Sequence, residues 1–372
     1  MSTSPARGAG AGQVPPDPAP TRPAPRSAAA EVPPGTAPTR PAPSVPPSPR
    51  VADPADFETH GSIYQPRGPL ARPLVGPQAD RYPFKGRIGE PEFPAEGGRY
   101  HLYVSYACPY AHRALIIRAL YGLEEAVSVS VVDPIRDGRG WAFRHGDGIT
   151  LDTGGRGFAY LSEAYDSSSP GGVYSGHVSV PALWDKHAGR IVSNHYPTIY
   201  LDLANGLRAY ATRNRDLDLA PAELAETQSA LAEHVAWGLN QGVYRAGFTA
   251  SQTDHDAAVE DVYATLDQLE KELTASCANL LGEQLTFVDV QTWVTLVRFD
   301  PVYYGHFKLA RRQLRDYPAL WAYARRLMTR AEFRDTTKLD QIIRHYYGTQ
   351  RHINPTGIIP DPPQIDWSYP ND

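Results

Sequence analysis

Apolar and polar residues alternate from Tyr100 to Tyr106, and a mostly apolar stretch follows. The alternation places every second residue on one face of an extended chain, which predicts a strand. Residues 111–121 are largely apolar and predict a mostly buried helix. Pro109 suits the first turn of that helix, where a missing N–H has no intrahelical partner. Gly122 suits its end.

Cys108 stands at the junction between this strand and this helix. The free N–H groups and the positive dipole end at a helix start favour the thiolate, which is the nucleophilic form of cysteine. We therefore predict a reactive Cys108; the alternative is a buried, inert cysteine. Position 111 is alanine, so a disulfide at Cys108 needs an outside thiol unless Cys277 folds nearby. We interpret Cys277 as structural, because no basic or helix-start context surrounds it.

The pattern of the chain changes near residue 206. Residues 99–206 alternate between strand and helix, which predicts an α/β domain with a thioredoxin-like sheet. Residues 207–345 show helical spacing and predict an all-α domain. Aliphatic residues at three-four spacing from Val259 to Leu273 define one face of a helix. Thr286 and Asp289, just before a long apolar run, predict an N-terminal capping box.

The two ends of the chain differ from this body. Residues 1–55 are rich in Pro and Ala and have little apolar surface to bury, so we expect a disordered tail. A proline-recognition ligand is the alternative for this tail. Residues 56–98 carry scattered aromatic residues and are expected to pack on the body as an extension. Residues 346–372 form a C-terminal extension.

Composition narrows the function further. A net charge of −5, with 21% charged residues, gives no indication of a nucleic-acid surface. Two cysteines in 372 residues favour a reducing compartment, and we expect a cytoplasmic protein. No apolar run is long enough for a membrane span, and no signal peptide is present, so we expect no membrane contact. We expect no metal site.

The segment Cys108-Pro109-Tyr110-Ala111-His112-Arg113 resembles a motif of the Xi-class glutathione transferases, the glutathionyl-hydroquinone reductases. Their usual motif is Cys-Pro-Trp-Ala-His-Arg, so Tyr110 is a departure. Three later blocks resemble the family in the same order, at 240–248, 298–321 and 345–360. The resemblance implies a thioredoxin-like N-terminal domain, an all-α glutathione-transferase C-terminal domain and a homodimer. It also implies a cis bond before Pro181.

The resemblance also implies roles for single residues. Cys108 matches the catalytic cysteine, and Tyr244 and Tyr303 match tyrosines that contact a quinol substrate. A tyrosine hydroxyl can donate a hydrogen bond or a proton to a phenolic oxygen. Without the resemblance, both tyrosines read as core aromatics. Trp141 and Val180 match positions that contact a low-molecular-weight thiol, which is the implied co-substrate; no tightly bound cofactor is implied.

The thiol site departs from the family pattern. His177 stands where the family has arginine, and Ser193-Asn194-His195-Tyr196-Pro197 replaces a Ser-Asn-Glu-Ser segment. In the family, that Glu binds the ammonium of glutathione, and the Ser with nearby N–H groups binds its carboxylate. His195 cannot replace the carboxylate, Tyr196 is bulkier than Ser, and Pro197 removes an N–H from a helix start.

Three readings of this combination remain open. The protein is a reductase or transferase that uses another thiol, with mycothiol and ergothioneine as candidates and His195 and Tyr196 in the thiol site. Alternatively, it is a weak glutathione enzyme that reduces a quinol conjugate or joins glutathione to an electrophile. The third reading is a non-catalytic binding protein on the same scaffold, because a fold does not fix a function.

Overall fold

The computed structural model describes residues 48–67, 80–275 and 278–369. Two short segments of regular structure, α1 (Phe57–His60) and the hairpin β1 (Gly61–Ser62) with β2 (Gln65–Pro66), precede the main sheet. Cys277 and most of the expected tail, residues 1–47, lie outside the described residues. Among the described residues, no helix combines the length and the apolar character needed to cross a bilayer.

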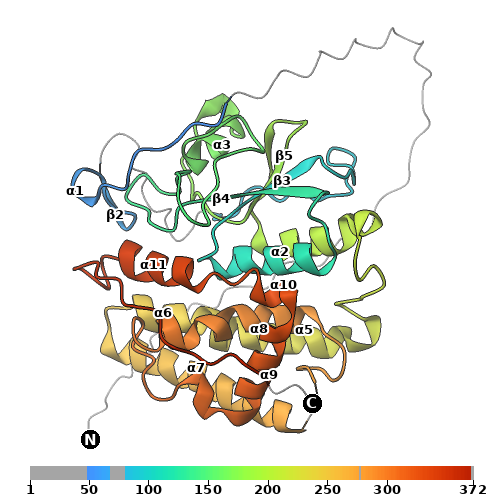
Figure 1. Ribbon diagram of the computed structural model, residues 1–372, viewed down its shortest axis with the longest axis vertical. Coiled ribbons are helices and arrows are strands. Elements are labelled where there is room, and N and C mark those ends of the chain that lie inside the picture. Colours follow the sequence, from blue (N-terminus) through green and yellow to red (C-terminus); the bar gives the residue numbers. More distant parts are fainter. Residues whose placement is uncertain (1–47, 68–79, 276–277, 370–372) are drawn as a thin grey trace, which may run out of the picture. The chain divides into compact units, whose positions relative to one another are not determined.

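A four-stranded mixed sheet forms the centre of the first half (Figure 1). Its strands lie in the order β4-β3-β5-β6. Their bounds are β3 (Tyr100–Val104), β4 (Val127–Val131), β5 (Ala182–Asp185) and β6 (Arg190–Ser193). β3 pairs with β4 in parallel and with β5 antiparallel, and β5 pairs antiparallel with β6. The peptide bond between Val180 and Pro181, just before β5, is cis.

Helices cover both faces of this sheet, with α2 (Pro109–Leu120) on one side and α3 (Leu161–Ser167) on the other (Figure 1). The alternation predicted for the first strand is confirmed. Tyr100, Leu102 and Val104 share the core on the α2 side. Tyr103 lies in the separate core on the α3 side. The sequence therefore sets both layers through a strand that is buried on both faces.

Every regular element among the described residues after η1 (Pro170–Gly172), β5 and β6 is helical, which confirms the two-part fold. These elements are α4 (Tyr196–Leu201), η2 (Asp202–Gly206), η3 (Arg208–Tyr210), η4 (Ala222–Leu224), α5 (Ala225–His234), η5 (Val235–Gln241), α6 (Gly242–Phe248), α7 (Gln252–Ala275), α8 (Phe287–Arg298), η6 (Phe299–Tyr303), η7 (Leu314–Asp316), α9 (Pro318–Thr329), α10 (Ala331–Arg334) and α11 (Leu339–Thr349). The segments η2, η5 and η6 are π-helical turns.

The predicted features of the helical half are present. The aliphatic face of α7 is buried from Val262 to Leu273. Thr286 and Asp289 form the capping box at the start of α8, with the Thr286 N–H donating to Asp289 Oδ2 at 2.8 Å. Asp289 Oδ1 also accepts from the Tyr323 hydroxyl at 2.9 Å. The capping box therefore both starts α8 and ties it to α9.

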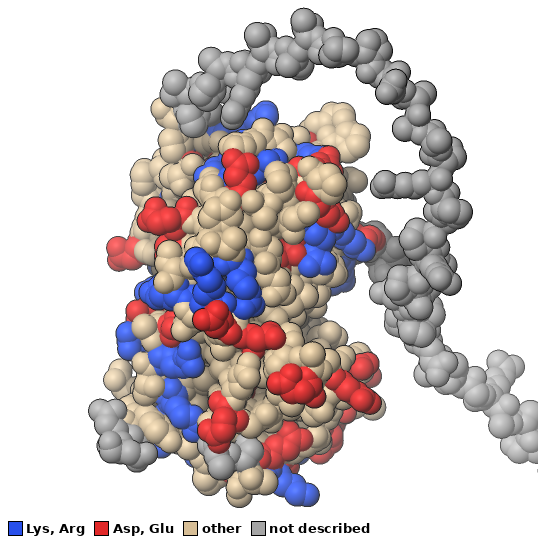
Figure 2. All heavy atoms as spheres, turned by 90° about the vertical axis from the view of Figure 1, so that its right-hand side faces the viewer, with Lys and Arg blue, Asp and Glu red and all other residues tan. Residues whose placement is uncertain are grey.

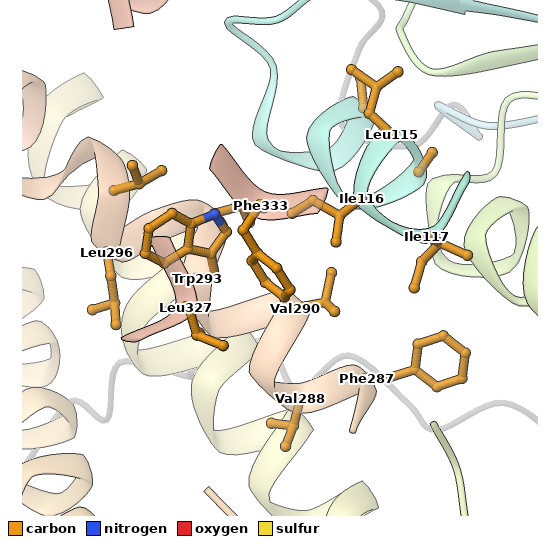
Figure 3. Packing of buried hydrophobic residues seen from close by; sticks show 14 of the residues in the cluster. Leu115, Ile116, Ile117, Phe287, Val288, Val290, Trp293, Leu296, Leu327 and Phe333 are labelled. Atoms are coloured by element: carbon orange, nitrogen blue, oxygen red, sulfur yellow. The ribbon is translucent and has the colours of Figure 1, made fainter. Parts of the chain in front are cut away.

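The helix that begins at Cys108 packs directly on the helical half. Figure 3 shows Ile116 and Ile117 of α2 pointing toward a layer that includes Val290, Trp293 and Phe333. All five side chains are buried within one continuous core. Interiors of this kind are close-packed and resist displacement. The position of α2, and with it that of Cys108, is therefore set by both halves of the fold.

Two expected boundaries fall inside packed structure. The segment around Ala52, placed in the tail, lies on the body: the Ala52 N–H donates to the Phe143 carbonyl at 2.9 Å, and the Ala52 side chain is buried. The short apolar side chain lets the backbone approach closely enough for this bond. The expected start of the C-terminal extension, residue 346, lies within α11.

Candidate active site

A cavity of about 460 Å³ opens beside Cys108. Its walls come from three parts of the chain. The sheet half contributes Cys108, Tyr110, Arg136, Trp141, His177 and Val180, the helical half contributes Tyr244, Phe248, His345 and Tyr346, and the N-terminal extension contributes Tyr64, Arg81 and Tyr82, among others. Aromatic rings and a few polar groups at this volume are typical of a small-molecule site.

Cys108 is the N-cap residue of α2 and is half-buried in this wall. Its Sγ lies 3.3 Å from the Val180 carbonyl oxygen. Burial raises the pKa of the Cys108 thiol, and the N–H groups of Ala111 and Tyr110 offset only part of that effect. Burial therefore opposes the preference for the thiolate that the helix start favours. The helix start does lower the pKa, as expected, but loss of hydration outweighs it.

Arg298 holds the loop that carries Cys108. It is fully buried at the end of α8 and donates to the carbonyls of Tyr106 and Ala107 at 2.8 and 3.2 Å. It also donates to Nδ1 of His112 at 3.1 Å. Burial, together with Arg298, holds the pKa of His112 well below its ordinary value, so the ring is neutral. Arg298 thus fixes the backbone before Cys108 and supplies positive charge near the thiol.

Three tyrosines of the helical half are joined through their hydroxyl groups, and we call Tyr244, Tyr303 and Tyr346 the hydroxyl cluster. The Tyr346 hydroxyl lies 2.5 Å from that of Tyr244 and 3.2 Å from that of Tyr303. Burial raises the pKa of all three phenols. They remain protonated at neutral pH and can act as hydrogen-bond donors.

Three other tyrosines meet through their rings, and we call Tyr82, Tyr110 and Tyr196 the ring cluster. The ring centroids of Tyr110 and Tyr196 are 4.0 Å apart, and those of Tyr82 and Tyr196 are 5.3 Å apart. No hydrogen bond engages their hydroxyls within the part of the chain that the structure describes. Tyr196 faces a second cavity, of about 310 Å³, and Tyr110 lines both cavities. The ring cluster therefore forms a partition between the two.

Comparison with known proteins identifies the scaffold. Residues 252–326 match the family described as the glutathione S-transferase C-terminal domain. The chain is 40% identical to the glutathionyl-hydroquinone reductase PcpF of Sphingobium chlorophenolicum over 268 residues, covering 72% of this chain and 84% of PcpF. It is also 40% identical to the glutathionyl-hydroquinone reductase YqjG of Escherichia coli, covering 77% of this chain and 86% of YqjG. The chain belongs to the family of Xi-class glutathione transferases and glutathionyl-hydroquinone reductases.

Solved structures agree with this assignment. The Xi-class enzyme of Natrialba magadii matches with a TM-score of 0.75 at 36% identity, covering 80% of this chain and 92% of that one. The glutathione-bound structure of YqjG matches with a TM-score of 0.71 at 40% identity, covering 75% of this chain and 89% of that one. This Xi-class member is accordingly an enzyme of the thiol transferase and reductase type.

The structure brings some of the predicted site residues together and separates others. Cys108, Trp141, Val180 and Tyr244 line one cavity. Tyr303 does not line it, because Tyr346 stands in front of it as its hydroxyl partner.

His195 and Tyr196 do not line the Cys108 cavity either. The ring of Tyr110 separates Tyr196 from it. Nδ1 of His195 is instead 3.1 Å from the Thr198 hydroxyl, at the start of α4. Both residues were expected in the thiol site, but they lie on the far side of the Tyr110 ring from the Cys108 cavity.

Sequence reasoning missed two residues of this Xi-class cavity. Tyr346 belongs to a block that carries the family resemblance, so its signal was present, but no pattern distinguished it from the neighbouring Tyr347. Arg136 lies in an irregular loop after β4, where neither periodicity nor spacing indicates direction. Its guanidinium lies 4.0 Å from the centroid of the Trp141 ring.

Proposed function

We propose that this protein is a thiol-dependent reductase that removes the thiol from a thiol–quinol thioether, with Cys108 as nucleophile. One observation carries the proposal: the half-buried Cys108 thiol shares an aromatic cavity with the hydroxyls of Tyr244 and Tyr346. A sulfur nucleophile facing phenol donors suits a substrate that carries both a thioether and a phenolic oxygen. The names of PcpF and YqjG support the same reaction class.

The reaction balances in three steps. The ring carbon that bears the sulfur first takes up a proton while a ring hydroxyl gives one up, which leaves a carbonyl on the ring. The Cys108 thiolate then attacks the thioether sulfur, the bond from that sulfur to the ring carbon breaks, and its electron pair passes to the carbonyl oxygen, which takes up a proton. A mixed disulfide between Cys108 and the thiol remains. A second thiol molecule then attacks this disulfide and releases the Cys108 thiolate. The quinol ring is reduced, and two thiol molecules are oxidised to one disulfide.

The hydroxyl cluster serves the departing quinol. Negative charge develops on a ring oxygen as the carbon–sulfur bond breaks, and preorganised donors stabilise such charge. Burial keeps both phenols protonated, and because the Tyr244 and Tyr346 hydroxyls share one hydrogen bond, one of the two remains free to donate to that oxygen. Tyr303 acts behind them as a positioning residue through its contact with Tyr346.

The thiol co-substrate differs from glutathione in this proposal, and mycothiol and ergothioneine are the candidates. Among the described residues that line the Cys108 cavity, none is a carboxylate that could hold the ammonium of glutathione. Pro197, at the start of α4, removes an N–H donor, and Tyr196 fills the adjoining space against Tyr110. Trp141 and Val180 flank the bound thiol, whereas His195 and Tyr196 shape its surroundings from behind the ring cluster.

Mass spectrometry tests the central step. The enzyme, held with a thiol–quinol conjugate and no free thiol, is expected to gain the mass of the thiol on Cys108. Cys108→Ala is expected to lose turnover by at least about 1,000-fold, because a nucleophile has no substitute in the cavity. Full turnover by Cys108→Ala would end the proposal. Calorimetric titration with glutathione, mycothiol and ergothioneine tests the thiol, and tightest binding of glutathione would remove that part alone.

We also infer a homodimer and a cytoplasmic location, the first from the family and the second from the low cysteine content. Light scattering of the purified chain tests the assembly, and a monomer at all concentrations would contradict it.

A further inference from the structure

Three arginines of the loop after β4 have different partners. Arg139 forms a salt bridge with Asp137 at 2.7 Å, and Arg144 forms one with Asp133 at 3.1 Å. The guanidinium of Arg136 has neither a salt bridge nor a hydrogen bond within the described residues, and its Nε is buried without a partner. A buried donor without a partner costs free energy, so its retention calls for an explanation.

Arg136 is held in the Cys108 cavity. Its guanidinium lies over the Trp141 ring at 4.0 Å, and Trp141 in turn stacks on His345 with ring centroids 5.3 Å apart. The Arg136 N–H donates to the Thr349 hydroxyl at 3.2 Å, which ties the loop to α11. The side chain is thus preorganised by stacking, and its planar donor edge is left unused.

The charge of the cavity has one sign. Arg81 and Arg136 line it, and no Asp or Glu does so among the described residues. Burial lowers the pKa of His177 to about 4 and that of His345 to about 3, so neither ring adds charge at neutral pH. On the face of the molecule drawn in Figure 2, by contrast, basic and acidic side chains lie next to one another. An anion in the cavity would pair with a cation that is otherwise uncompensated.

We propose that the aromatic part of the substrate carries an anionic group, a carboxylate, which Arg136 binds. That this aromatic group belongs to a thiol–quinol conjugate rests on the proposed function, whereas the binding of a carboxylate by Arg136 does not. Arg136 lines the cavity together with Tyr64, Cys108 and Tyr244. Tyr64 and Tyr244 both pack edge-on against Phe248, so they belong to the aromatic side of the cavity. Arg136 also lies over Trp141, which flanks the bound thiol, so it stands where the thiol meets the quinol and can reach a carboxylate on the quinol ring.

A carboxylate suits Arg136 for geometric reasons as well. The planar guanidinium presents parallel N–H donors that match the two oxygens of a carboxylate. One O–H of the neighbouring pair Tyr244 and Tyr346 remains available for a phenolic oxygen on the same ring. The cavity can therefore distinguish an acidic quinol from a neutral one through a single extra contact.

Binding to the Cys108→Ser variant of the full chain tests the proposal without turnover. Calorimetry compares hydroquinone with 2,5-dihydroxybenzoate, which is hydroquinone with one added carboxylate. We expect the carboxylate to tighten binding by about 30-fold, the order of a charge-assisted pair in a partly desolvated site. Arg136→Met is expected to reduce this preference to about twofold, and Arg136→Lys to keep part of it. Arg81→Met, which removes the other, exposed arginine of the cavity, is the matched control and is expected to retain the preference.

The other outcomes overturn the proposal. Equal binding of the two aromatics by Cys108→Ser overturns it even if Arg136→Met fails to fold. So does a preference that Arg81→Met abolishes and Arg136→Met keeps. Arg136→Met can also weaken the binding of both aromatics equally. If the same substitution in the chain that keeps Cys108 also raises the pKa of Cys108, Arg136 serves the thiolate and the proposal is overturned.

If the protein prefers the carboxylate but turns over no conjugate, the proposed function is wrong and the carboxylate site at Arg136 stands. If it turns over conjugates but shows no preference for the carboxylate, the proposed function stands and the carboxylate site is wrong.

Discussion

Cys108 lies between two groups of three tyrosines that differ in how they make contact. The hydroxyl cluster is joined oxygen to oxygen, with a shortest separation of 2.5 Å. The ring cluster is joined by one tilted and one edge-to-face contact, with a shortest centroid separation of 4.0 Å. The first belongs to the helical half, and the second surrounds the start of α2. The same residue type therefore builds a donor site on one side and a wall on the other.

The difference shows what decides the role of a buried tyrosine. Burial raises the pKa of Tyr82 to about 12, and it also raises the pKa of Tyr346. Loss of hydration acts on both clusters, so it does not separate them. Rings meet in both clusters, so what separates them is whether the hydroxyl groups also meet, as they do only in the hydroxyl cluster among the described residues. We expect the hydroxyl cluster to donate a hydrogen bond to the substrate, and the ring cluster to form part of the cavity wall.

The largest expected effect comes from Arg298, which connects the helical half to the loop before Cys108. Arg298→Met leaves the carbonyls of Tyr106 and Ala107 and the ring of His112 without their donor. Hydrogen bonds to a charged group contribute about 1.5–3 kcal/mol each, partly offset by the relief of a buried charge. We expect the free energy of unfolding to fall by about 3 kcal/mol, measured by urea titration.

The nearby Arg326, on α9, gives a comparison for this change. Its half-buried side chain donates to a carbonyl far from Cys108. We expect Arg326→Met to cost less and to leave the pKa of Cys108 unchanged, whereas Arg298→Met raises it. Equal pKa values of Cys108 in both variants would contradict the role given to Arg298.

The next effect tests the hydroxyl cluster against the ring cluster. Tyr346→Phe removes one hydroxyl and is expected to lower kcat about 100-fold, the low end for loss of a positioned acid. Tyr110→Phe removes a hydroxyl from the ring cluster and is expected to stay within about twofold, because its ring contacts persist. Steady-state rates with one thiol–quinol conjugate measure both. Similar losses in the two variants would break the comparison.

A smaller effect tests whether the ring cluster excludes glutathione. His195→Glu combined with Tyr196→Ser supplies a carboxylate and opens the space beside Tyr110. We expect glutathione affinity to rise about tenfold, the equivalent of about 1.4 kcal/mol. Tyr196→Phe keeps the ring and is expected to leave the affinity unchanged. No gain in the double variant would show that Pro197 alone prevents the helix start from binding the anion.

The smallest effect is the pH dependence of Cys108. Its pKa is raised by burial, so the thiol is protonated at neutral pH and only a small fraction is thiolate. Below the pKa, the thiolate fraction grows with pH, and alkylation by iodoacetamide is expected to accelerate about threefold from pH 7.5 to 8.0. Mass spectrometry of Cys108 at a series of pH values measures this rate. A rate that is already constant above pH 7 would contradict the raised pKa.

The sequence alone determined much of the framework. Alternation placed Tyr100, Leu102 and Val104 on one face, and the spacing from Val259 to Leu273 identified the face of α7 that is buried from Val262 onward. Those signals are local, so a single chain displays them. The cis bond before Pro181 followed from family resemblance rather than from any local pattern.

The site itself depended on contacts between distant segments. Whether Tyr303 or Tyr346 faces Cys108 is decided by how η6 and α11 pack, and no periodicity reports that. Arg136 looked like one of several arginines in a loop until the salt bridges of Arg139 and Arg144 left it alone. The net pKa of Cys108 likewise required the surrounding burial, which helix position alone does not supply.

The apolar face of α2 has a consequence for how this chain folds. Ile116 and Ile117 are covered by residues of α8 and α10, which are synthesised long after α2. The sheet half on its own would expose this face to water, where it favours aggregation. We therefore expect the two halves to unfold as one cooperative unit, and we expect the half that contains Cys108 not to fold by itself. A nascent chain that stops before α8 contains Cys108 but lacks the residues that cover α2.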